Sequence, residues 1–324
     1  MDIVSIGEQI AYDNISAIDS LFVQSKTANL KVAVAQLTAG GTIPQMAQVH
    51  AFDTEARIGS RASFETLKFE KLLIKEKLNQ GESLRYYLEE MGATDDEATL
   101  KGFIFNDVNT LVKRVQTRAT VMNGELLSTG KITVDENNVN TTIDMGMSID
   151  NIITLTGWAT AGTDVIGQLE TVIANAKAKG VTIQRAITSS KQLARLAKNT
   201  AIATHMSNIK MVPSIANLKT WLSEAIGIPF ATIDDVYTTD ANGGTTNRVF
   251  DEDVITFLPT LGTIGSGLWG VTPEEKELDV ALSGFVATTK YTTPDPVAVW
   301  TKASGIYLPV IADINKMFIG NIAS

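Results

Sequence analysis

The sequence predicts an α+β fold in which one very long helix lies along β-strands, and a compact α/β unit is inserted before the chain returns to strands. Apolar residues recur at helical spacing between about residues 95 and 127. Helical and strand-like segments then alternate from about residue 163 to residue 258. Before the helix, residues 51–78 alternate charged and apolar side chains, as a β-ribbon does. This order of segments favours an α+β protein with an inserted domain.

The composition is that of a globular protein with two domains. The chain has 324 residues, of which 44% are hydrophobic and 19% charged. Single cores rarely extend beyond roughly 250–300 residues. There is no apolar run of about 18 residues, so we expect no membrane-spanning helix. The opening Met1–Val4 has no basic region followed by an apolar one, so we expect no secretory signal.

Charge and residue content exclude several classes of function. The formal net charge is −9, whereas proteins that grip DNA through its phosphates usually carry a basic surplus. An acidic chain can still enclose DNA without sequence-specific binding. The absence of cysteine excludes disulfides, thiolate zinc sites and cysteine nucleophiles. His50 and His205 lie far apart, and neither has the spacing of a metal site.

The first 50 residues are expected to form an arm. Ile15, Ile18, Leu21 and Phe22 recur at the spacing of a short helix, and residues 30–34 alternate like a strand. This segment holds too few large apolar groups to form a core of its own. We therefore expect it to lie on another surface.

The next segment, residues 51–80, is expected to be an extended loop. Arg57, Arg61, Lys68 and Lys71 alternate with acidic and apolar residues, which suits a two-stranded ribbon with both faces in water. An isolated hairpin is marginally stable, so a neighbouring subunit would have to hold it. We expect these four cations to pair with acidic residues of that neighbour. A surface helix is the alternative for residues 71–77.

The strongest local signal is the long helix. Thr94 and Glu97 have the spacing of a capping box. An apolar stripe follows, consisting of Leu100, Ile104, Val108, Leu111, Val115, Ala119, Met122 and Leu126. At 1.5 Å per residue the helix would be roughly 50 Å long. We expect Gly130 to end it, and the stripe to pack on strands near 131–145 and 284–291. A coiled coil is the alternative.

The remaining elements alternate between strand and helix. We expect a hairpin from residues 131–134 and 141–145, with its turn at Asn137–Asn138. Further helices are expected at 164–179, 189–198 and 214–226, strands at 181–187, 228–237, 253–258 and 282–290, and turns at 240–244 and 294–296.

No catalytic, cofactor-binding or metal-binding residues are predicted. Residues 124–132 echo a phosphate loop, but five residues separate the glycines and Ile132 stands where a hydroxyl is needed. Residues 262–267 are rich in glycine without the strand–loop–helix order of a dinucleotide site. Ser189 and Ser190 begin a helix and suit caps. The acidic residues at 234–235 and 251–253 match no calcium loop and suit solvated turns.

The order of segments resembles the major capsid proteins of tailed bacteriophages, which have the Hong Kong 97-type fold. Local phrases resemble the family typified by the lambda head protein, phage major capsid protein E. These phrases are Ala56–Arg61, Phe257–Pro259 with Gly262, and Asp295–Pro296 followed by Ile306–Ile311. The resemblance implies an N-terminal arm (1–50), an extended loop (51–80), a peripheral domain with a spine helix (81–150, completed by 281–324) and an α/β axial domain (151–280).

The resemblance also implies a function. It is that of a structural protein, not an enzyme, whose hexamers and pentamers form the icosahedral head around double-stranded DNA, with no cofactor and no membrane. Implied partners are a portal protein and, in some relatives, scaffolding and decoration proteins. The implied location is the virion, after synthesis and assembly in the cytoplasm of the bacterial host. The alternatives are an encapsulin-type nanocompartment, which shares the fold, and an unrecognised α/β enzyme.

Overall fold

The structure is a computed structural model that describes residues 14–37, 43, 46–47, 64–80, 86, 96–158, 160, 162–212, 214–239, 244–278, 280–295 and 297–323. Within the long helix, side chains are described from residue 106 onward. The chain forms two compact units. Unit 1 comprises Met1–Val32, Phe69–Asn123 and Gly265–Val310, and unit 2 comprises Ala33–Lys68, Gly124–Ile264 and Ile311–Ser324.

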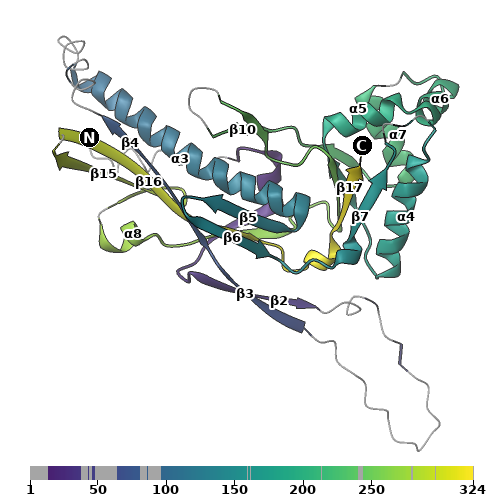
Figure 1. The fold of residues 1–324 in the computed structure, drawn as a ribbon, viewed down its shortest axis with the longest axis horizontal. Helices are drawn as coiled ribbons and strands as arrows, with labels where there is room; N and C mark the ends of the chain where they lie inside the picture. Colours follow the sequence, from purple (N-terminus) through teal and green to yellow (C-terminus); the bar gives the residue numbers. More distant parts are fainter. Residues whose placement is uncertain are drawn as a thin grey trace, which may run out of the picture. The chain divides into compact units, whose positions relative to one another are not determined.

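A mixed β-sheet forms the centre of unit 1 (Figure 1). Its strands run in the order β1, β13, β16, β15, β14, and β4 also pairs with β16. β1 is parallel to β13, and the other pairs are antiparallel. The bounds are β1 (Phe22–Lys26), β4 (Leu72–Gln80), β13 (Gly265–Trp269), β14 (Ala281–Ser283), β15 (Val286–Pro294) and β16 (Val297–Val310). The short helices are the 3₁₀-helix η1 (Ala17–Leu21) and α8 (Pro273–Glu277).

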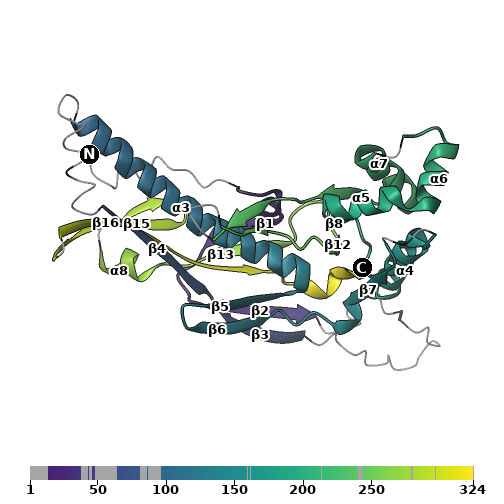
Figure 2. The ribbon, with the colours of Figure 1, turned by 45° about the horizontal axis from the view of Figure 1, so that its top comes forward.

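The predicted long helix is α3 (Asp96–Thr129), and within unit 1 it lies along this sheet (Figure 2). Its contact is with β16, because a Cβ on Gly305 would lie 3.0 Å from Val115 Cγ1. The helix ends as expected at Gly130, which has a φ of +74° and donates from its amide to the Leu126 carbonyl. Packing on a strand fits the helix-on-sheet expectation rather than the coiled coil.

The buried face of α3 is broader than the predicted narrow stripe. Val108, Leu111, Val115 and Met122 are buried, as are Ala119 and Leu126. The side chains of Leu100 and Ile104, like the Thr94 capping box, lie outside the described residues. Beside the stripe, four polar residues are also buried: Gln116, Thr120, Asn123 and Ser128. A buried polar side chain needs hydrogen-bond partners, so α3 does more than cover apolar surface.

The charged segment forms strands, but not the predicted hairpin within residues 51–78. β3 (Phe64–Glu70) pairs with β2 (Lys31–Leu37), whereas β4 pairs with β16. One residue, Lys71, separates β3 from β4, so the chain passes from one sheet into another instead of folding back. Residues 72–80 are therefore extended, and the helical alternative is wrong. The two-stranded ribbon is made by β2 and β3, which flank residues 38–63.

Unit 2 is the predicted α/β unit, with its sheet in the order β7, β17, β12, β8, β9. The strands are β7 (Ile152–Thr156), β8 (Arg185–Thr188), β9 (Phe230–Thr232), β12 (Val254–Leu258) and β17 (Phe318–Ala323). The helices are α4 (Val165–Ala178), α5 (Ser190–Lys198), α6 (Thr200–Asn208) and α7 (Ile215–Ile226). Buried residues from the sheet and all four helices form one core, which includes Trp158, Leu169, Leu222, Phe257 and Phe318.

The caps of these helices follow the sequence. Asp164, Ser189 and Ser214 each accept a hydrogen bond from a backbone amide at the start of α4, α5 and α7. The sequence did not predict α6, which begins directly after α5. Asn199 ends α5 and also accepts from the Ala201 amide at the start of α6. Because Asn199 is the only residue between the two helices, the sequence has no separate linker that would mark the start of α6.

Two hairpins complete unit 2. β5 (Lys131–Glu136) and β6 (Val139–Asp144) join at Asn137 and Asn138, whose φ values are +50° and +64°. The turn lies at the predicted residues, and positive φ at both central residues is a conformation that asparagine tolerates. β10 (Val236–Thr238) pairs with β11 (Thr246–Arg248), and most of the predicted turn at 240–244 lies outside the described residues.

The domain boundaries differ from those that the sequence suggested. The C-terminal strand β17 lies between β12 and β7, so residues 311–324 belong to unit 2 and do not complete the peripheral domain. Conversely, residues 265–280 belong to unit 1, because β13 pairs with β16. Residues 14–32 are also part of unit 1, where Ile18, Leu21 and Phe22 are buried. This part of the predicted arm shares the core of its own chain.

Candidate functional site

The β2–β3 ribbon carries the first group of predicted interface residues. Lys68 is exposed on β3, whereas Arg57 and Arg61 lie outside the described residues. Leu67 and Phe69 are partly buried, and Glu65, Lys68 and Glu70 are exposed, which leaves charged groups of both signs in water. A ribbon with this pattern presents charge that another molecule can pair with.

The base of the ribbon is fixed within unit 2. The Gln36 side-chain amide donates to the Met145 carbonyl at 2.6 Å, and Gln36 is buried. Gly146 has a φ of +73°, and a Cβ there would lie 3.1 Å from Leu67 Cδ1. A side chain at residue 146 would therefore meet both backbone strain and the ribbon. These contacts hold one end of the ribbon and leave its charged residues in water.

Lys71, the fourth predicted interface cation, has a different place. It is 3% exposed, and its Nζ donates to the Thr27 hydroxyl at 2.6 Å, the Thr27 carbonyl at 3.2 Å and the Trp269 carbonyl at 2.9 Å. Burial lowers its pKa. All three hydrogens of the ammonium group are used inside unit 1, so Lys71 does not belong to the interface set. It fixes the point where β3 passes into β4.

We predict that Lys71→Met lowers the free energy of unfolding by about 1–3 kcal/mol, because it leaves buried acceptors without a donor. The effect should depend on pH. The pKa of Lys71 is below 10.5 in the folded chain and returns to about 10.5 in the unfolded chain. At pH values between the two, the unfolded chain therefore binds more protons. Wild-type stability relative to the variant should therefore rise as pH increases through that window towards 10.5. Urea unfolding of both proteins from neutral to alkaline pH tests this, and a difference that stays flat or falls would contradict it.

A second buried polar network joins η1 to α3 and β16 within unit 1. Asp19 is 1% exposed, and its Oδ2 accepts from the Ile15 amide (3.0 Å), the Ser16 amide (3.2 Å) and the Thr120 hydroxyl (2.9 Å). Its Oδ1 accepts from Asn123 Nδ2 at 2.9 Å, and Asn123 Oδ1 in turn accepts from the Tyr307 hydroxyl at 2.7 Å. Hydrogen bonds replace the water around this carboxylate. The network explains why α3 buries Thr120 and Asn123 beside its apolar stripe.

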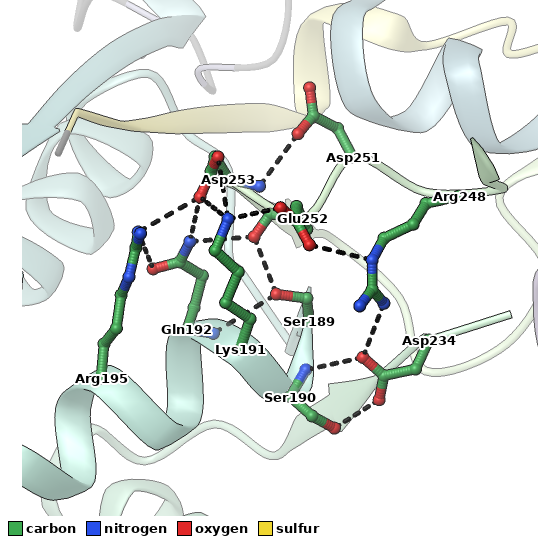
Figure 3. A network of polar contacts seen from close by, with 10 residues as sticks. All are labelled: Ser189, Ser190, Lys191, Gln192, Arg195, Asp234, Arg248, Asp251, Glu252 and Asp253. Carbon is green, nitrogen blue, oxygen red and sulfur yellow. Dashed lines mark hydrogen bonds and ion pairs between the residues drawn. The ribbon is translucent and has the colours of Figure 1, made fainter. Parts of the chain in front are cut away.

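A third polar cluster lies at the start of α5 in unit 2 (Figure 3). Lys191 pairs with Glu252 and, at 3.1 Å, with Asp253. Arg195 pairs with Asp253 at 3.2 Å. The hydrogen bond to Glu252 is the main cause that raises the pKa of Lys191. The acidic turn is therefore paired with cations, where the sequence suggested only a solvated turn.

The same cluster extends to the β10–β11 hairpin. Arg248 pairs with Glu252 at 2.9 Å and with Asp234 at 3.4 Å, and Asp234 accepts from the Ser190 amide and hydroxyl. These side chains are partly exposed, and such ion pairs contribute only about 0–1 kcal/mol each. Their joint effect is to tie the hairpin and the acidic turn to α5. This arrangement suits a fixed surface.

Neither a metal site nor a membrane-spanning helix occurs among the described residues. Within this part of the chain, no group of three histidine or acidic residues could hold a metal ion. Among the described helices, none is long and apolar enough to cross a membrane.

Comparisons with known proteins find one matching family model and several similar structures. The family model of phage major capsid protein E matches residues 16–322. A search of curated proteins gives no match. A phage-related protein from Bordetella bronchiseptica RB50 has a similar structure, with a TM-score of 0.58, 11% identity, and coverage of 98% of this chain and 95% of that one.

Two further structures are also similar. A putative capsid protein of an Escherichia coli CFT073 prophage has a TM-score of 0.58 at 14% identity, with coverage of 98% of this chain and 95% of that one. The capsid of Myoviridae phage XM1 has a TM-score of 0.51 at 11% identity, with the same coverage of both chains. At these identities the likeness shows the fold alone, and it confirms the predicted fold class.

Proposed function

Because this chain belongs to the phage major capsid protein E family, and is a structural protein of a phage shell, we propose that its copies form a closed icosahedral head built from hexamers and pentamers around double-stranded DNA. The family match over residues 16–322 carries this proposal. Its place is the virion. We further propose synthesis and assembly in the cytoplasm of the bacterial host, a portal protein at one vertex, and no catalytic activity.

The geometry supports assembly through weak contacts repeated many times. The β2–β3 ribbon presents charged side chains in water, and its base is fixed by Gln36 and Gly146. Exposed ion pairs are individually weak, but a shell repeats each contact many times. In this proposal Lys68, with Arg57 and Arg61, pairs with acidic residues of a neighbouring subunit. The net charge of −9 would also limit adhesion of the enclosed DNA.

The family match favours a phage shell over a nanocompartment that holds protein cargo. The two differ in content. Shells recovered from phage-producing cells should contain DNA, whereas a nanocompartment would contain a cargo protein. Nuclease-protected DNA inside purified particles therefore separates the alternatives. Scaffolding or decoration proteins would appear in the same particles as additional bands.

The assembly proposal predicts a specific result for the ribbon. The purified protein, alone or with a scaffold, should form shells, rings or tubes in negative-stain images. The double variant Arg57→Glu/Arg61→Glu should remain folded by circular dichroism but assemble poorly, because its charges would repel the acidic partners. Unfolding of that variant would mean that these arginines act within the subunit.

A matched control changes the same charge elsewhere. Lys177 and Lys198 are exposed in unit 2, and Lys177→Glu/Lys198→Glu alters the net charge by the same amount. We expect this control to assemble like the wild type. If the control fails as badly as the ribbon variant, net charge and not the ribbon is responsible. If both variants assemble normally, the ribbon proposal is wrong while the shell function stands.

A further inference from the structure

The unit 1 sheet has a second face, which points away from α3 and has no role in the ribbon contacts proposed above. Along β16, Gly305 and Tyr307 face α3, since Gly305 lies against Val115 and Tyr307 donates to Asn123. Successive side chains of a strand point to opposite faces. Trp300 and Ile306 therefore lie on the face away from α3.

The strand register adds neighbours from β4 and β15 to this face. Leu73 is opposite Ile306, Lys75 is opposite Ser304, and Lys77 is opposite Lys302. On the other side of β16, Tyr291 is opposite Trp300. We call the set Leu73, Lys75, Lys77, Tyr291 and Trp300 the lysine–aromatic face.

The side chains of this face are arranged as a platform. Lys77 Nζ lies 4.1 Å from the centroid of the Trp300 ring, which is a cation–π contact. The rings of Tyr291 and Trp300 are nearly parallel, at 14° with centroids 6.4 Å apart, and Trp300 Nε1 donates to the Thr293 hydroxyl at 3.2 Å. The aromatic pair is thus held in place by contacts within the sheet. A preorganised platform loses little conformational freedom when a partner binds.

The lysine–aromatic face is exposed to water and carries two lysines. Leu73 is 45% and Tyr291 40% exposed, and Lys75 and Lys77 are also exposed. The adjacent Lys302 differs, because it pairs with Glu274 of α8. Among the residues that the structure describes, no carboxylate pairs with Lys75 or Lys77. Two uncompensated cations beside exposed aromatic and aliphatic surface form a recognition surface, since tyrosine and tryptophan are enriched in interfaces.

We propose that the lysine–aromatic face binds an acidic segment of a second copy of this chain. Charge complementarity favours this partner: acidic residues outnumber basic ones in each copy, 36 to 27, whereas Lys75 and Lys77 have no carboxylate partner among the described residues. Nucleic acid fits less well, because two cations are few for a phosphate-binding surface on an acidic chain. The inference rests on the proposed shell function, in which each copy meets identical copies.

The first test is a charge reversal with a matched control. Lys75→Glu changes the face, whereas Lys290→Glu makes the same change at an exposed residue of β15 next to Tyr291, on the opposite side of the sheet. Light scattering should show that Lys75→Glu raises the protein concentration needed for assembly by about tenfold, through like-charge repulsion with the acidic segment. Lys290→Glu should change that concentration by less than about twofold. Equal behaviour of the two variants would overturn the proposal.

The second test identifies the partner directly. Shells assembled from mixed ¹⁴N- and ¹⁵N-labelled chains are treated with a carbodiimide, which links lysine amines to carboxylates, and are then digested for mass spectrometry. We expect links from Lys75 or Lys77 to an aspartate or glutamate of the other isotope. If Lys75 and Lys77 are cross-linked only to carboxylates that carry the same isotope, or are not cross-linked at all, the proposal is wrong. Failure of the wild-type chain to form shells would instead overturn the proposed function.

A final arm of the same experiment addresses nucleic acid. Binding of double-stranded DNA to wild-type and Lys75→Glu protein is compared at several salt concentrations, because phosphate contacts are strongly salt-dependent. We expect the two proteins to differ in assembly and to bind DNA equally weakly. A loss of DNA binding with unchanged assembly would assign the face to nucleic acid and reject the second copy.

Discussion

Replacing Val115 with aspartate is expected to leave little soluble, folded protein. Val115 is 1% exposed and packs against β16 at Gly305, which has no side chain. A Cβ on Gly305 would lie 3.0 Å from both Val115 Cγ1 and Trp269 Cζ3, so a carboxylate has little room for accompanying water. Burying a charge without a partner costs several kcal/mol, out of a total stability of about 5–15 kcal/mol.

The control lies two residues earlier on the same helix. Lys113 is exposed, and surface substitutions usually change stability by no more than about 0.5 kcal/mol. Lys113→Glu should therefore remain soluble, with a urea midpoint close to that of the wild type. Soluble yield, circular dichroism and urea unfolding compare the two variants. If both aggregate or both fold, α3 does not have the buried and exposed sides assigned to it.

Local signals in the sequence predicted individual elements well. The apolar spacing and Gly130 located α3 to within about two residues at each end, the uncertainty with which helix boundaries are usually defined. The adjacent asparagines at 137 and 138 predicted a turn, and both have positive φ in the structure. Ser189 and Asp164 predicted the starts of α5 and α4. Each of these features depends on residues close together in the chain.

Pairing between distant segments could not be predicted in the same way. Nothing in the composition of β4 shows that it leaves the ribbon and pairs with β16, because strand partners are chosen by the whole sheet. The C-terminal strand β17 was assigned to the wrong unit for the same reason. Lys71 looked like one more cation in a charged segment. Its burial depends on Thr27 and Trp269, which lie far away in the sequence.

The Asp19 network is a second feature that sequence reasoning missed, and its removal should be costly. Asp19→Ala would leave Asn123 Nδ2 and the backbone amides of Ile15 and Ser16 without this acceptor, whereas the Thr120 hydroxyl would keep the Gln116 carbonyl at 3.1 Å. Each buried donor left unsatisfied costs about 1–3 kcal/mol. We expect the free energy of unfolding to fall by more than about 3 kcal/mol, measured by urea unfolding. Asp150→Ala, at a carboxylate that is 75% exposed, is the control and should have little effect.

Asp19→Asn separates the role of the carboxylate from that of its volume. The asparagine side chain has nearly the same shape, but one of its two terminal atoms is a donor. If the amide nitrogen takes the place of Oδ2, it faces three donors; if it takes the place of Oδ1, it faces Asn123 Nδ2. With Asn123 held in its present orientation by the hydrogen bond from the Tyr307 hydroxyl, either orientation of the new amide leaves donors opposed, so this variant should lose most of the stability that Asp19→Ala loses. An Asp19→Asn protein as stable as the wild type would show that Asp19 acts by filling space, and that the four hydrogen bonds do not hold η1 to α3.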